Sequence, residues 1–165
     1  MAVNVSSVQL RREDFVRTVA AAVELAGPEG GIDVEVTESL LMKDLADNIE
    51  KLSCIRDLGV GIALDDFGTG FSSLAYLAKL PVQTIKIDRS FIEAMLNDPS
   101  TMTLVSTIIS LAQSLKLKTV AEGVESEEQA KILRLLRCDQ MQGYLVSKPM
   151  SFEAMSDYLG SLPNG

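Results

Sequence analysis

Short apolar segments alternate with longer amphipathic segments along the whole chain, and this alternation restricts the possible fold more than any other feature. In the longer segments the apolar residues recur every three or four positions, which is typical of helices. Strands that alternate with helices form parallel βαβ units. The predicted strands are 2–5, 32–37, 61–65, 84–88, 118–122 and 140–145, and the predicted helices are 12–26, 39–58, 72–80, 90–96, 100–116, 126–137 and 151–160.

The side chains of these strands alternate between apolar and polar or small types. In strand 84–88, Ile85 and Ile87 point to one face while Lys86 points to the other. Strands of an open α/β sheet are buried on both faces and usually form continuous apolar runs. One apolar and one polar face instead favour a barrel with helices outside and a polar interior near its mouth. We therefore predict an α/β fold, an incomplete TIM-like (β/α) barrel of six parallel strand–helix units, in a single domain over residues 1–165.

Composition excludes several classes of function. The formal net charge of −8 argues against contact with nucleic-acid polymers or membranes, because both need a basic surface. The absence of histidine excludes Ser-His and Cys-His catalytic pairs and a zinc site of the usual His/Cys kind. We expect Cys54 and Cys138 to be buried apolar residues in a reducing compartment. Without a membrane-span or signal-peptide pattern, the chain is expected to be cytoplasmic.

Polar residues gather at the carboxyl ends of the predicted strands. In a (β/α) barrel the active site lies at this rim. Four carboxylates there would be costly to bury beside one lysine, so protonation or a bound cation must relieve them. Oxygen ligands favour Mg²⁺ or Mn²⁺, and adjacent carboxylates suit two metals that share an oxygen during phosphoester displacement. The residues at the rim are Asn4, Glu35, Asp65, Asp66, Lys86, Asp88, Glu122 and Gln142.

Other interpretations of these residues remain open. A single acidic residue after a strand is more often a helix N-cap or a solvated loop residue, and Asp98 and Glu125 fit that description. Lys86 is also compatible with Schiff-base chemistry in an aldolase-like barrel. A lysine among four carboxylates would have a raised pKa, however, and would be a poor nucleophile. The Gly- and Ser-rich segment 66–73 is either a mobile loop over the site or an ordinary βα turn.

Six motifs together resemble the EAL-domain cyclic-di-GMP phosphodiesterases. They occur in the order and approximate spacing of that family, from residue 3 to about residue 155. The resemblance implies a TIM-like barrel that hydrolyses the bacterial second messenger cyclic di-GMP to pGpG, with two Mg²⁺ or Mn²⁺ ions per complete site. The motifs are VNVS (3–6), EVTES (35–39), DDFGTGFSSL (65–74), KIDRSFI (86–92), AEGVES (121–126) and QGYL (142–145).

The resemblance also implies a role for each matching residue. Lys86 would orient the attacking water, and Glu122 would act as general base or contact the second metal through water. Glu38 would anchor the DFGTG loop, which in the family couples dimer contacts to metal binding. The implied metal ligands are Asn4, Glu35, Asp65, Asp66 and Glu122, and the implied supporting residues are Asp88, Glu125 and Gln142.

The chain departs from the family at its start. The family's first strand contains a Glu-Ala-Leu tripeptide whose glutamate is a metal ligand, and no such tripeptide occurs here. A complete (β/α)8 barrel needs ~250 residues, and a missing strand would leave an open edge that invites pairing. We therefore expect a truncated barrel with impaired hydrolysis. We further expect association as a homodimer or through edge strands, and a parent protein fused to sensor or GGDEF domains. A non-catalytic cyclic-di-GMP-binding or dimerisation module is the alternative.

Overall fold

Six parallel strands form one sheet in the computed structural model, which describes residues 1–27, 31–70 and 74–161. Each strand pairs with the next one in the chain, so the order is β1-β2-β3-β4-β5-β6 without a reversal. Helices follow the strands, as the alternation in the sequence predicts. The strands are β1 (Ala2–Asn4), β2 (Asp33–Thr37), β3 (Gly61–Phe67), β4 (Thr84–Ile87), β5 (Lys118–Glu122) and β6 (Gln140–Gln142).

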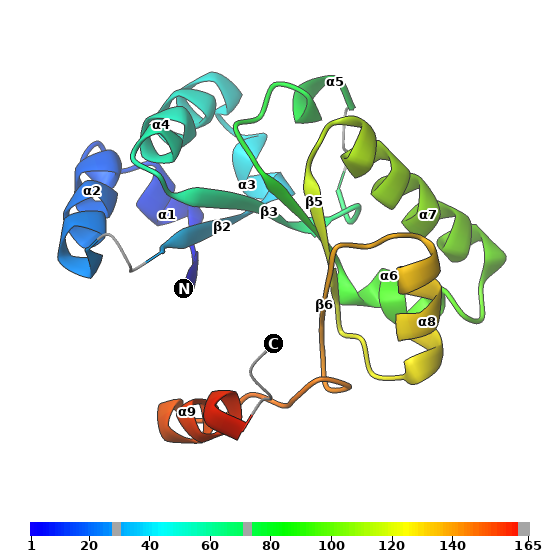
Figure 1. Cartoon of the computed structure of the whole chain (residues 1–165). Coiled ribbons are helices and arrows are strands. Elements are labelled where there is room, and N and C mark those ends of the chain that lie inside the picture. The colour runs from blue at the N-terminus through cyan, green and yellow to red at the C-terminus, as the bar shows by residue number, and fades with distance from the viewer. Residues whose placement is uncertain (28–30, 71–73, 162–165) are drawn as a thin grey trace.

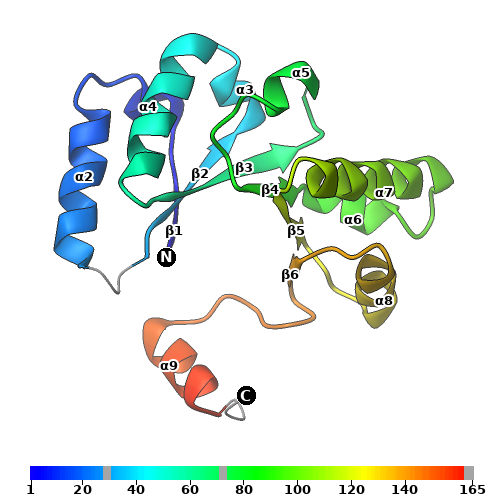
Figure 2. The same cartoon turned by 45° about the horizontal axis from the view of Figure 1, so that its top comes forward.

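The helices that follow β1 to β5 lie along the outer face of a curled sheet, which forms part of a (β/α) barrel (Figures 1 and 2). The last helix, α9, lies apart from the others in both views. None of the helices in the described segments is long and apolar enough to cross a membrane. The helices are α1 (Ser7–Leu10), α2 (Phe15–Ala26), α3 (Glu38–Leu41), α4 (Leu45–Asp57), α5 (Leu74–Leu77), α6 (Arg89–Ala94), α7 (Pro99–Ser114), α8 (Glu127–Leu135) and α9 (Phe152–Ser161).

The strand alternation divides the sheet into two chemically different faces. Val36, Ile85 and Ile87 are fully buried in the core beneath the helices. Lys86 and Glu35 lie between these apolar positions and line a cavity on the other face. The predicted incomplete barrel, with a polar interior, is therefore confirmed. Polar side chains from neighbouring strands meet on the inner face because consecutive strands are parallel and in sequential order.

The prediction of one helix over 39–58 is wrong, because the chain breaks at residues 42–44 into α3 and α4. The break is stabilised by Asn48, a buried residue in the first turn of α4. Its side-chain amide donates hydrogen bonds to the carbonyls of Leu40 (3.4 Å) and Leu41 (3.2 Å), which end α3. These carbonyls would otherwise lack intrahelical partners. The break lets α3 cover the end of β2 while α4 runs back along the sheet.

Two smaller expectations also differ from the structure. The predicted helix over 12–26 begins at Phe15, and a separate short helix, α1, precedes it. A capping box between Ser6 and Gln9 opens α1, and this Ser-x-x-Gln pattern was readable in the sequence. Cys54 is exposed on α4, whereas Cys138 is buried as expected.

Candidate metal centre

Lys86 lies at the centre of a carboxylate cluster in the mouth of the half-barrel. Its Nζ lies 2.9 Å from Glu35 Oε2, 3.0 Å from Asp65 Oδ1 and 2.7 Å from Glu122 Oε1. These residues come from β2, β3, β4 and β5, so the parallel strands bring them to one point. The Lys86 side chain is only 7% exposed. A single buried cation therefore pairs with three carboxylates, which leaves their negative charge in excess.

The protonation of Lys86 follows from these neighbours. Burial alone would lower the pKa of the ammonium, but its interactions with Glu122, Glu35 and Asp65 outweigh burial and raise that pKa above its ordinary value. The ammonium therefore stays charged at neutral pH. A permanently protonated lysine cannot attack a carbonyl, so the structure disfavours the Schiff-base interpretation. Burial raises the pKa of Glu122, while Lys86 opposes that shift.

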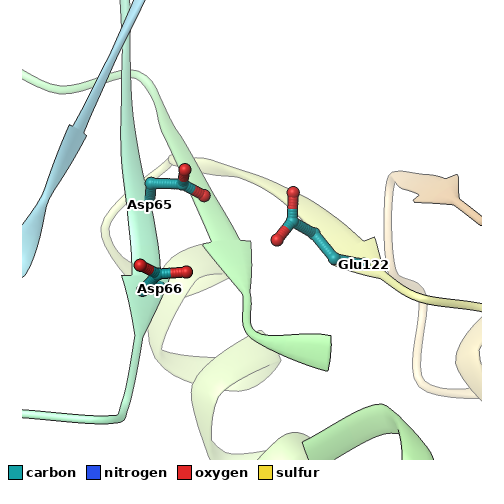
Figure 3. A group of neighbouring side chains, drawn as sticks. All are labelled: Asp65, Asp66 and Glu122. Atoms are coloured by element: carbon teal, nitrogen blue, oxygen red, sulfur yellow. The ribbon is translucent and has the colours of Figure 1, made fainter. Parts of the chain in front are cut away.

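Asp65 and Asp66 are consecutive residues of β3 and would point to opposite faces in a regular strand. A bulge removes that alternation, because the pairing of β3 with β4 shifts register between Leu64 and Phe67. At the bulge, Asp66 adopts a left-handed backbone conformation with φ +53°. Figure 3 shows both aspartates on the same side of β3, directed toward Glu122 of β5.

Three carboxylates in the described residues are arranged as metal ligands would be. One oxygen from each of Asp65, Asp66 and Glu122 lies within 4.8 Å of the others. The pKa of Asp66 is raised by burial and by the neighbouring charges of Asp65 and Asp88. Asp65 Oδ1 is buried and lies 3.0 Å from Lys86 Nζ, an ammonium that it shares with Glu35 and Glu122. A divalent cation held by the carboxylate oxygens would relieve the repulsion around Asp66, so the residues fit such an ion.

Asn4 and Gln142 flank this cluster through strand register. Asn4 ends β1 and pairs with Glu35, while Gln142 ends β6 and pairs with Glu122. Register partners on parallel strands present their side chains to the same face. Both residues are exposed and lie beside the cluster, outside the group of three carboxylates.

The remaining acidic candidates have local partners. Asp88 is the N-cap of α6, where Oδ1 accepts a hydrogen bond from Ser90 N at 2.9 Å. Asp98 is the N-cap of α7, so the capping interpretation of this residue is confirmed. Glu125 does not cap α8, since Ser126 does so through the predicted capping box with Gln129. Glu125 instead lies 3.2 Å from Arg89 Nη2, an interaction that the sequence analysis did not identify.

Glu38 is buried at the start of α3, directly beneath the loop that follows β3. Its side chain is 4% exposed, and neither carboxylate oxygen has a hydrogen-bond partner among the described residues. A Cβ atom at Gly70 would lie 3.1 Å from the carboxyl carbon of Glu38, so the loop passes close over this group. The rest of the predicted Gly- and Ser-rich segment, residues 71–73, lies outside the described residues.

Comparison with known proteins identifies one matching family model and several relatives of this chain. A family model described as EAL domain matches residues 1–149. The oxygen sensor protein DosP of Escherichia coli is 39% identical over 163 residues, which are 98% of this chain and 20% of DosP. Cyclic di-GMP phosphodiesterase NbdA of Pseudomonas aeruginosa is 43% identical over 160 residues, which are 96% of this chain and 20% of NbdA.

A solved structure resembles this fold closely. The PaMucR phosphodiesterase in complex with c-di-GMP aligns with a TM-score of 0.88 and 42% identity, over 93% of this chain and 63% of that one. The chain thus spans about a fifth of the length of the curated relatives DosP and NbdA, and about two thirds of the PaMucR chain.

Proposed function

The chain belongs to the EAL domain family, and on this premise we propose that it forms part of a metal-dependent phosphodiesterase that hydrolyses cyclic di-GMP to pGpG. The observation that supports this proposal most strongly is the crowding of four carboxylates around one lysine at the carboxyl ends of β2 to β5. Their formal charges sum to −3 with Lys86 included. Such a site attracts divalent cations, and those cations in turn attract a phosphodiester.

We propose two Mg²⁺ or Mn²⁺ ions per complete site. When bound, they would polarise the phosphoryl oxygen and neutralise the charge that develops on it. Oxygen ligation by carboxylates and an amide suits these hard ions. The proposed ligands are Asn4, Glu35, Asp65, Asp66 and Glu122.

The chain's own residues would guide the water that attacks phosphorus. The ammonium of Lys86 would orient this water and stabilise the developing negative charge, and its raised pKa keeps it protonated for that role. Glu122 would accept the water's proton as the bond from phosphorus to the leaving ribose oxygen breaks. Glu122 Oε1 lies 2.7 Å from Lys86 Nζ, so this base and the ammonium that would orient the water stand side by side. Asp88, Glu125 and Gln142 would support the site, and Glu38 would anchor the loop after β3.

The organisation of the whole protein is part of the proposal. Residues 1–165 would form a single domain, in a longer cytoplasmic protein that also contains sensor or GGDEF domains and associates as a homodimer. One observation supports a longer protein and one supports a sensor domain. The relatives DosP and NbdA are about five times longer than this chain, and DosP is named an oxygen sensor.

The test is product analysis with the full-length protein. Cyclic di-GMP is incubated with the protein and Mn²⁺ or Mg²⁺, and the nucleotides are separated by chromatography. We expect pGpG to appear only with metal, and to fall about a thousandfold in Lys86→Met. Lys118→Met is the matched control, because Lys118 lines the same cavity at the amino end of β5, and this variant should retain full turnover.

The alternative function is a module that binds cyclic di-GMP without cleaving it. Calorimetric titration of cyclic di-GMP into the same preparation separates the two functions. Metal-dependent binding with no pGpG after prolonged incubation would refute the phosphodiesterase proposal and establish a receptor.

A further inference from the structure

We propose that Arg89, the first residue of α6, is a positioning residue for Glu122, the carboxylate at the end of β5. It does so by holding the turn between β5 and α8, residues 123–125. This inference rests on the proposed function, since it assigns Arg89 to the same metal centre. Arg89 itself contacts none of the three carboxylates that surround Lys86.

The aliphatic part of Arg89 lies across Gly123, the residue directly after Glu122. A Cβ atom at Gly123 would lie 2.3 Å from Arg89 Cγ and 2.9 Å from its Cβ and Cδ, so only glycine leaves room for this side chain. Gly123 also has φ +70°, a conformation that glycine adopts without strain. The turn and the arginine side chain therefore fit together, and neither can move without displacing the other.

The guanidinium of Arg89 contacts two glutamates, Glu125 in the turn and Glu93 on α6. Its Nη2 lies 3.2 Å from Glu125 Oε1, and its Nε donates a hydrogen bond to Glu93, one turn further along α6. Glu93 thus fixes the orientation of the planar guanidinium, which in turn fixes Glu125. Both ends of the turn are held from α6, because Gly123 lies under the aliphatic part and Glu125 pairs with the charged head.

A second side chain holds the same turn from the buried side. Gln129 of α8 accepts hydrogen bonds from the backbone N–H groups of Glu125 (2.8 Å) and Ser126 (3.0 Å). Its amide donates to the carbonyl of Ile92 in α6 at 3.0 Å. Gln129 is 7% exposed, so it contributes to folding stability. Arg89 is 54% exposed, and exposed ion pairs stabilise a fold only slightly. The role proposed for Arg89 is therefore in the geometry of the turn and only slightly in the stability of the fold.

The sign of the effect on metal binding distinguishes positioning from a simple charge effect. A cation that merely lies near the site repels Mn²⁺, so removing its charge should tighten Mn²⁺ binding or leave it unchanged. A cation that positions Glu122 and its neighbours should have the opposite effect, because removing it loosens the ligands. Residues that orient metal ligands typically contribute tenfold or more to affinity or activity.

The experiment uses the full-length protein and Mn²⁺ alone as the calorimetric titrant. In Arg89→Met, which keeps the aliphatic part without the charge, we expect Mn²⁺ affinity and kcat/KM each to fall about tenfold. Arg89→Lys keeps a cation near Glu125 and should recover most of that loss. Arg134→Met is the control, because Arg134 pairs with Glu127 at 3.7 Å on α8, away from the centre, and it should bind Mn²⁺ as the wild type does.

Melting temperature completes the test. Arg89→Met should melt within about 2 °C of the wild type, whereas Gln129→Ala should melt clearly lower. Unchanged or tighter Mn²⁺ binding by folded Arg89→Met would overturn the inference. The proposed function fails separately, if the wild type binds Mn²⁺ in an Arg89-dependent manner but releases no pGpG.

Discussion

The two ends of β5 use polar side chains in opposite ways. Near the amino end, the Asp139 carboxylate accepts hydrogen bonds from Thr119 N and Oγ1, both at 2.8 Å. The backbone N–H of Asp139 donates a hydrogen bond to Thr119 Oγ1 at 3.0 Å. Thr119 N, Thr119 Oγ1 and the Asp139 carboxylate thus satisfy one another. At the carboxyl end, β2, β3 and β5 each direct a carboxylate at the single ammonium of Lys86 on β4. Groups that satisfy one another stabilise the fold, whereas charge in excess of its partners indicates a binding site.

The largest effect should come from removing the cation at the carboxyl end. Lys86→Met leaves the carboxylates of Glu35, Asp65 and Glu122 crowded without a counter-charge. We expect the free energy of unfolding to fall by about 3–5 kcal/mol, the usual cost of breaking a buried charge pair. Urea denaturation measures this change, and added Mn²⁺ should restore part of it. A loss no larger than that of an exposed ion pair would show that the cluster is not electrostatically coupled.

At the amino end of β5, substitution of Asp139 should lower the stability of the fold without changing the rate of hydrolysis. Asp139→Ala removes the acceptor of both the Thr119 N–H and the Thr119 hydroxyl proton in a fully buried position, while the hydrogen bond from the backbone N–H of residue 139 to Thr119 Oγ1 remains. The expected loss is about 1–3 kcal/mol in the free energy of unfolding, with kcat unchanged for the fraction that is folded. Parallel denaturation and turnover assays check this pair of results. A large fall in kcat would contradict the separation between the two ends.

Substitution of Asp66 should have the opposite pair of effects, because the folded state should become more stable while hydrolysis is lost. Asp66→Gly removes a left-handed aspartate and a carboxylate that Asp65 and Asp88 repel, so unfolding should cost about 1 kcal/mol more. Metal-dependent hydrolysis should disappear. Asp66→Asn, which tolerates the same backbone conformation, separates the loss of charge from the relief of backbone strain.

The pH dependence of the same variant follows from the raised pKa of Asp66. A carboxyl whose folded pKa lies above its unfolded value stabilises the fold below the unfolded pKa, and this stability is lost as pH rises through the folded pKa. In the presence of a chelator, the stability of the wild type relative to Asp66→Asn should therefore fall as pH rises above the unfolded pKa of about 4. A difference in stability that does not change with pH above about 4 would contradict the repulsion assigned to Asp66.

The smallest effect should come from a helix cap away from both ends. Hydrogen bonds from Thr101 and Ser100 lower the pKa of Asp98 to about 2. Since its folded pKa lies below its unfolded value, its contribution is present at neutral pH and is lost as pH falls through the folded pKa. Asp98→Asn keeps an acceptor at the N-cap, so it should change stability slightly at pH 7 and weaken the dependence on pH between about 4 and 2.

Much of the fold could be predicted from the sequence because local patterns determine it. The alternation of Ile85, Lys86 and Ile87 was enough to separate a barrel from an open sheet. The break in the helix over 39–58 could not be predicted, because it depends on a tertiary contact from Asn48 to the carbonyls of α3. The hydrophobic period continues across the break, and the one local signal is Asp44 at the N-cap of α4 with Asp47 in its first turn.

The identity of the residues in the candidate site could be predicted from the sequence more fully than their geometry. Strand ends placed Glu35, Asp65, Lys86 and Glu122 together, and the structure pairs them. Strand alternation alone would have directed Asp66 away from Asp65, and the bulge that brings them together depends on the pairing of β3 with β4. The contact between Arg89 and Gly123 depends on the packing of α6 against β5, which sequence spacing cannot show.

The excess of carboxylates at the carboxyl end of the strands is the central claim, and Mn²⁺ titration of the full-length protein tests it most directly. Wild type and Asp66→Asn are titrated by calorimetry at neutral pH, with Asp139→Asn as the control from the opposite end of β5. The account predicts that Asp66→Asn binds Mn²⁺ at least about tenfold more weakly, and that the control binds it as the wild type does. Equal affinity in all three proteins would contradict the account.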